Sequence, residues 1–150
     1  MAILCVNAGS SSLKFSLHQF HDHSVDSAWV SGALQGLEPG GSPSLVWSMA
    51  GQSQHETLSV TPGDGFADAF LRLRSWLRDL SGMPPLRAVA HRVVHGGADF
   101  SQATLVTPEV MQRLSQLSSL APLHQPHNLA GITAFAESFP NVPQVACFDT

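Results

Sequence analysis

The sequence predicts an α/β domain with a mixed sheet and helices packed on it. This prediction comes from apolar, strand-like runs near both ends of the chain, a serine-rich turn that folds the first run into a hairpin, and helical spacing of apolar residues between them. With 150 residues, 43% hydrophobic and 12% charged, the chain is one domain by size and globular by composition. The periodicities alone permit several α/β folds.

Strands and helices are expected in mixed order along the chain. Strands are expected at 3–6, 13–18, 24–37, 44–49, 55–60, 86–95 and 143–148, with turns at 7–12 and 51–54. A helix should open at Pro62 and end near Leu80. Thr107, followed by a proline, should cap a helix running to about Ser119, and Asn128 should cap another that ends at Phe139.

Charge and hydropathy exclude several classes of function. The formal net charge is −4, and no basic patch with interleaved aromatic residues is found, so nucleic acid is not an expected partner. No apolar run approaches the ~20 residues of a membrane span, and nothing before the first strand serves as a signal peptide. We therefore expect a cytoplasmic protein with Cys5 and Cys147 as buried thiols, although a disulfide between them stays open.

The segment 7–14 carries the first candidate site. Asn7 ends the first strand, and Ser10, Ser11 and Ser12 precede Lys14, the only lysine of the chain. Small residues let a ligand approach the backbone closely, and lysine adds a point charge, so the hairpin tip suits a phosphate. An ordinary serine-rich turn with a solvated lysine explains the same residues equally well.

A second candidate site is the strand that ends in His95-Gly96-Gly97. Side chains alternate along a strand, so Arg92 and Val94 should share one face and His91 the other. A guanidinium binds a carboxylate with two hydrogen bonds, and the valine offers apolar contact to a short acyl chain. The alternative is a structural strand whose arginine pairs with an acidic side chain.

Four motifs resemble the acetate kinase family. The stretch V-N-A-G-S-S-S-L-K-F resembles its amino-terminal signature, and H-R-V-V-H-G-G resembles its second signature. L-A-P-L-H-Q-P is similar to the family's L-A-P-L-H-N-P, with Gln125 in place of the usual Asn. The final F-D-T resembles the start of F-D-T-A-F-H. The motifs occur in family order between Asn7 and Thr150.

The resemblance implies roles for residues of the second, third and fourth motifs. Arg92 would contact the substrate carboxylate beside Val94, and Leu123 would border the acyl pocket. His124 would lie near the transferring phosphoryl group, and Asp149 is the residue usually described as catalytic. Because acetate is already ionised at pH 7, we expect Asp149 to organise metal-bound water or hold Arg92 rather than remove a proton.

The same resemblance implies an ATP and metal site in the first motif. Lys14 and the loop Ser10–Ser12 would face the phosphates, and Asn7 resembles the family's Mg²⁺-site residue. Mg²⁺, or Mn²⁺ in its place, would be the cofactor and ATP the co-substrate. Whatever the usual Asn does at the position of Gln125 is in doubt here.

The implied fold is the ribonuclease-H-like half-domain of the superfamily of acetate and sugar kinases, Hsp70 and actin. The implied activity is reversible transfer of the ATP γ-phosphoryl group to acetate or propionate, giving an acyl phosphate and ADP. Residues 1–150 would be the amino-terminal domain of such a kinase, without its carboxy-terminal nucleotide-binding domain, and inactive alone. The full-length enzyme would be a homodimer acting on small molecules.

Two other functions remain open. An isolated domain of this fold could serve as a non-catalytic binding or regulatory module. A sugar or glycerol kinase is a weaker alternative, because it leaves the Arg92–Val94 pair unexplained. Acetate and propionate differ by one methylene, worth only about 1–3 kcal/mol in a pocket, so the sequence does not separate them.

Overall fold

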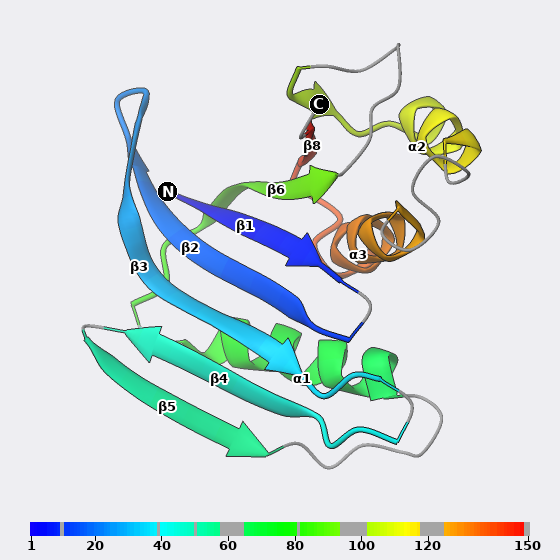
Figure 1. Ribbon diagram of the computed structural model, residues 1–150. Helices are drawn as coiled ribbons and strands as arrows, with labels where there is room; N and C mark the ends of the chain where they lie inside the picture. The colour runs from blue at the N-terminus through cyan, green and yellow to red at the C-terminus, as the bar shows by residue number, and fades with distance from the viewer. Residues whose placement is uncertain are drawn as a thin grey trace.

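A mixed sheet with helices on one face forms the domain (Figure 1). The computed structural model describes residues 1–9, 11–38, 40–49, 51–57, 65–80, 82–93, 102–117 and 125–148. The strands are β1 (Ala2–Ala8), β2 (Leu13–His21), β3 (Ser24–Gln35), β4 (Ser44–Met49), β5 (Gln52–Thr57), β6 (Leu86–Val93), β7 (Thr104–Leu105) and β8 (Gln144–Phe148). The helices are α1 (Gly65–Asp79), α2 (Pro108–Gln116) and α3 (Gln125–Ser138).

The strand order in the sheet is β5-β4-β3-β2-β1-β6-β8-β7. The first five strands in sequence form an antiparallel meander, whereas β6 pairs with β1, and β8 with β6, in parallel. The central order β3-β2-β1-β6-β8 is that of a ribonuclease-H-like half-domain, so the expected fold class is confirmed. The β4–β5 hairpin extends this sheet at one edge (Figure 1).

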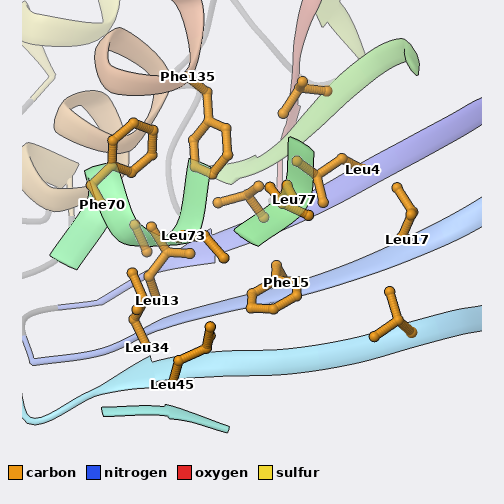
Figure 2. Close-up of a cluster of buried hydrophobic side chains, with 14 of the residues drawn as sticks. Leu4, Leu13, Phe15, Leu17, Leu34, Leu45, Phe70, Leu73, Leu77 and Phe135 are labelled. Atoms are coloured by element: carbon orange, nitrogen blue, oxygen red, sulfur yellow. The ribbon is translucent and has the colours of Figure 1, made fainter. Parts of the chain in front are cut away.

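One face of the sheet forms the core (Figure 2). Alternate residues of β1 and β2 are buried there, which is the period-two pattern of a half-covered strand. Helix α1 buries Ala69, Leu73 and Leu77 at intervals of one helical turn against this face. Phe70 of α1 and Phe135 of α3 meet edge to face with ring centroids 4.7 Å apart, so both helices share one core.

Of the two helix caps predicted from the sequence, one is confirmed and the other is wrong. Thr107 caps α2, where the Val110 N–H donates to its Oγ1 at 3.2 Å and Pro108 follows at the first helical position, as expected. Asn128 does not cap a helix. It lies inside α3, which already begins at Gln125, and its side chain is buried.

Several strand boundaries also differ from expectation. β5 begins at Gln52 rather than His55. The turn before it is shorter than expected, because Gly51 adopts φ +78°, a left-handed conformation that glycine takes without strain. The short β7 was not expected; it pairs with β8 at the edge of the sheet. The expected start of α1 at Pro62 and the end of β6 at His95 lie outside the described residues.

Gly32 of β3 leaves room for an aromatic cluster beneath the sheet. The Trp76 ring of α1 lies 5.6 Å from Phe15 and 5.1 Å from Trp47. A Cβ at Gly32 would lie 2.4 Å from the Val46 carbonyl oxygen and 2.7 Å from Phe15 Cζ. Since the nearer of these atoms is backbone, the close approach of β3 and β4 depends on glycine.

We expect Gly32→Ala to destabilise the protein by about 1–3 kcal/mol or more, because overpacking must displace a strand or the Phe15 ring. The midpoint of urea unfolding measures this. Ser31→Ala, at the exposed neighbouring position, is the matched control and should shift the midpoint little. Equal shifts for the two variants would contradict the argument.

Candidate active site

The carboxyl end of β1 lies between β2 and β6, and residues of all three strands line one cavity. Asn7 of β1 faces Lys14 of β2 across the antiparallel ladder, and Val6 pairs with His91 of β6. Asn7, Lys14 and Arg92 all line a cavity of about 320 Å³. These residues come from two motifs separated by more than seventy positions in the sequence, and folding brings them to the same place.

The cavity lies on the sheet face opposite the core. Buried residues of β1 alternate with the half-buried Cys5 and Asn7, and on β6 the exposed Arg92 lies between the buried His91 and Val93. The predicted alternation around Arg92 is therefore confirmed for the described residues. The remaining lining residues are Cys5, Val6, Phe15, Ser16, Ala90, His91 and Cys147.

The electrostatic character of the cavity is positive. Lys14 and Arg92 supply two cations, and the described lining contains no carboxylate. Cys5 and Cys147 are free thiols. Burial raises the pKa of both, and their proximity raises the pKa of Cys5 further. The thiols therefore stay protonated near neutrality, and the cavity suits an anion.

The hairpin loop closes on itself through its backbone. The Gly9 N–H donates to the Ser12 carbonyl oxygen at 2.8 Å, and the Leu37 N–H donates to the Ser11 carbonyl oxygen at 3.0 Å. Ser11 and Ser12 do not line the cavity, and the Gly9 N–H is already used. A phosphate role for these two serines stays a prediction. Ser10, Val94, Leu123, His124 and Asp149 lie outside the described residues.

Asn128 ties α3 to the end of β1, a link that sequence reasoning missed. Its Nδ2 donates to the Ala8 carbonyl oxygen at 2.8 Å, and the side chain is 3% exposed. A Cβ at Gly131, one turn further along α3, would lie 3.1 Å from the Ala8 Cβ, so helix and strand approach closely. This contact fixes the strand end that carries Asn7. The signal in the sequence, an asparagine before an apolar helix, is equally typical of a cap.

His91 precedes Arg92 on β6, and its side chain lies on the opposite, core face of the strand. Its Nε2 is 2.6 Å from Gln144 Oε1 of β8, and Gln144 Nε2 donates to the Val142 carbonyl oxygen at 3.1 Å. Since the amide nitrogen of Gln144 is engaged, its oxygen accepts from His91 Nε2–H. Burial lowers the pKa of His91 to about 4, and the hydrogen bond to Gln144 opposes this only in part. The histidine is neutral and cross-links β6 to β8.

Comparison with known proteins identifies the family. The Acetokinase family model matches residues 2–150. The chain belongs to this family. It is 41% identical to an acetate kinase of Rhodopseudomonas palustris over 99% of the chain, and 39% identical to an acetate kinase of Shouchella clausii over the same share. The matched regions are 37% and 36% of those relatives, so the chain spans little more than a third of their length.

Two solved structures share the fold over nearly the whole chain. A propionate kinase from Francisella tularensis has a TM-score of 0.85 and an acetate kinase from Porphyromonas gingivalis one of 0.83, each with 31% sequence identity. Both comparisons cover 99% of this chain, and 36% and 37% of the respective structures. The chain therefore corresponds to little more than a third of each of these structures. In the part that the structure describes, no helix is long and apolar enough to cross a membrane.

Acidification should destabilise the domain through His91. The unfolded chain takes up a proton near pH 6.5, whereas the folded chain does so only near pH 4. The stabilisation is therefore complete above pH 6.5 and is lost as the pH falls toward 4, by about 3 kcal/mol in total. Urea unfolding between pH 7.5 and 4.5 measures this slope. His91→Gln should flatten it, and the exposed His55→Gln control should not; identical slopes in both would contradict the assignment.

Removing the tie between α3 and β1 should cost more than removing a hydrogen bond within α3. Asn128→Ala leaves the Ala8 carbonyl without this donor, and we expect a loss of about 1–3 kcal/mol in unfolding free energy. The control is Thr133→Val, which removes the Oγ1 donor to the Leu129 carbonyl within the same helix. Chemical denaturation of both variants is the measurement. A larger loss in Thr133→Val would contradict the proposed importance of the tie.

Proposed function

We propose that the complete protein containing this chain transfers the γ-phosphoryl group of ATP reversibly to a short-chain carboxylate, acetate or propionate, giving ADP and an acyl phosphate. The observation that carries the proposal is the cavity in which Asn7, Lys14 and Arg92 meet, in a chain of the Acetokinase family. Relatives named acetate kinase and propionate kinase support the substrate class.

Arg92 binds the substrate carboxylate in this proposal. Its planar guanidinium donates two parallel hydrogen bonds to a carboxylate and holds one oxygen in line with the γ-phosphorus. The carboxylate is ionised at neutral pH, so it attacks without losing a proton. Ala90 of the cavity lining, with Val94 and Leu123 as predicted from the motifs, offers apolar contact to the short acyl chain.

Lys14 and Asn7 act on the phosphate side. Lys14 offsets negative charge on the transferring phosphoryl group, where electrostatics and positioning supply most of the rate. The amide oxygen of Asn7 is a fitting ligand for Mg²⁺, which takes few protein oxygens together with waters and phosphates. When bound, the metal would supply positive charge that offsets the negative charge of the phosphates, and Asn7 would help to hold it. Within the described residues no group of three or more His, Cys, Asp or Glu side chains could hold a metal.

The remaining motif residues complete the site. Asp149 directly follows Phe148, the last residue of β8, and β8 pairs in parallel with the strand that carries Arg92. We propose that Asp149 holds Arg92 or orients metal-bound water, that His124 lies near the phosphoryl group and that Ser10, Ser11 and Ser12 contact the phosphates. Because the chain spans little more than a third of its relatives, we expect residues 1–150 alone not to turn over substrate.

Arg92→Lys in the full-length protein should lower kcat/KM for the carboxylate roughly 10- to 100-fold, because lysine keeps the charge and loses the paired hydrogen bonds. The measurement is acyl hydroxamate formation with ATP and, side by side, acetate, propionate and butyrate. The control is Arg87→Lys, on the same strand but outside the cavity lining. This substitution should change kcat/KM by less than about twofold.

Two results would contradict the proposal. Wild-type protein that binds ATP and carboxylate without forming acyl hydroxamate would favour the non-catalytic module. Equal activity of Arg92→Lys and Arg87→Lys would contradict the role of Arg92 in binding the carboxylate, although the proposed reaction itself would stand. The substrate with the highest kcat/KM then decides between acetate and propionate.

A further inference from the structure

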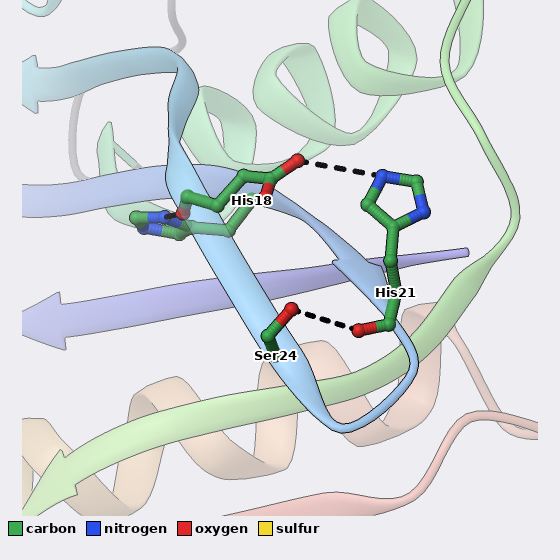
Figure 3. A network of polar contacts seen from close by, with 4 residues as sticks. His18, His21 and Ser24 are labelled. Atoms are coloured by element: carbon green, nitrogen blue, oxygen red, sulfur yellow. Dashed lines mark hydrogen bonds and ion pairs between the residues drawn. The ribbon is translucent and has the colours of Figure 1, made fainter.

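A serine–histidine pair lies at the edge of the same cavity and has no role in the phosphoryl transfer described above. Ser16 lies two residues beyond Lys14 on β2 and lines the cavity. Its Oγ is 2.8 Å from Nε2 of His18, and Nδ1 of His18 is 2.9 Å from the backbone carbonyl oxygen of Asp26 on β3. Figure 3 shows the His18 ring between β2 and β3, with His21 and Ser24 nearer the hairpin tip.

The partners of His18 fix where its proton lies. A carbonyl oxygen only accepts hydrogen bonds, so Nδ1 carries the hydrogen and donates it to Asp26. In the neutral ring Nε2 is then an acceptor, and the Ser16 hydroxyl donates to it. Serine hydroxyls are activated by such an arrangement, in which the hydroxyl is hydrogen-bonded to a base and a third group orients that base.

A strand irregularity brings the pair together. In a regular strand, residues i and i+2 are separated by about 6.6 Å along the chain, and their side chains stand parallel. The register of β2 against β3 shifts between Leu17 and His18, and again between His18 and Phe20. Such bulges re-aim a side chain, and here the shift accompanies the reach of His18 to both Ser16 and Asp26.

The surroundings favour Ser16 over its neighbours as the nucleophile. Cys5 lies directly across the ladder from Ser16. Burial keeps its thiol protonated, so it does not compete. Lys14 and Arg92 line the same cavity and would stabilise an anionic leaving group.

We propose that Ser16, with His18 as general base, accepts an acyl group from an acyl phosphate bound in this cavity. The Ser16 Oγ bonds to the carbonyl carbon, and Nε2 of His18 takes the hydroxyl proton. The bond from that carbon to the bridging oxygen breaks, and inorganic phosphate leaves with the electron pair. The product is an O-acyl serine, which water can hydrolyse to return the carboxylate. The acyl phosphate is the product assigned under the proposed function, on which this step rests.

The test uses full-length protein and acetyl phosphate, without ATP. Samples are quenched in acid at short times, the acetyl adduct is located by tandem mass spectrometry, and released inorganic phosphate is measured. We expect an acetyl group on Ser16, and phosphate release that Ser16→Ala abolishes. His18→Gln should slow both roughly 100-fold, as expected for loss of a general base. The matched control His21→Gln, an exposed histidine 3.4 Å from the Asp26 carboxylate, should leave both unchanged.

Several outcomes would overturn the inference. These are the absence of both the adduct and Ser16-dependent phosphate release in wild type, an adduct on Lys14 or Cys5 instead, or equal rates in His18→Gln and His21→Gln. Hydroxamate formation from ATP and acetate, measured on the same preparation, separates the two proposals. Kinase activity without Ser16 acylation refutes only the inference, and His18-dependent acylation without kinase activity refutes only the proposed function. Thermal unfolding of each variant shows that it is folded.

Discussion

The pairing of β1 on both of its edges is the constraint on which the candidate site depends. β1 runs antiparallel to β2 and parallel to β6, and its even-numbered residues are buried on the core face. Because side chains alternate along a strand, burial of Val6 and Ala8 places Asn7 on the opposite face. A slip of one residue would bury Asn7 and expose an apolar side chain, so the hydrophobic core itself determines that Asn7 lies beside Lys14.

Helix α3 connects that core to the site. It contributes Phe135 to the core, packs closely against Ala8 through Gly131 and bonds the Ala8 carbonyl through Asn128. One helix therefore both seals the apolar face and holds the end of β1. The segment that precedes α3 in sequence carries Leu123, predicted to border the acyl pocket, and His124, predicted to lie near the transferring phosphoryl group.

The sequence was informative where its signal is local. Alternation in β2, spacing in α1 and the Thr107 cap predict their elements because each depends on neighbouring residues. The motifs predicted a shared site for Asn7, Lys14 and Arg92, which the cavity brings together. The role of Asn128 depends on a carbonyl 120 residues away, and the contact between Ser16 and His18 accompanies a shift in register against β3. The partner of Asn128 is not visible in local periodicity. Alternation places Ser16 and His18 on one face of β2, but the shift in register that accompanies their contact could not be predicted.

The charge of the cavity has a consequence for the order of events at this site. Two cations and a neutral amide oxygen line it, the two thiols are protonated, and the described lining has no carboxylate. A lone divalent cation would meet repulsion from Lys14 and Arg92, with a single amide oxygen in return. A polyphosphate reverses this balance, since its oxygens pair with the cations and carry the metal as well. Under the proposed function, these residues would therefore receive anions first, and Asn7 would become a favourable ligand only for a metal that arrives on the nucleotide.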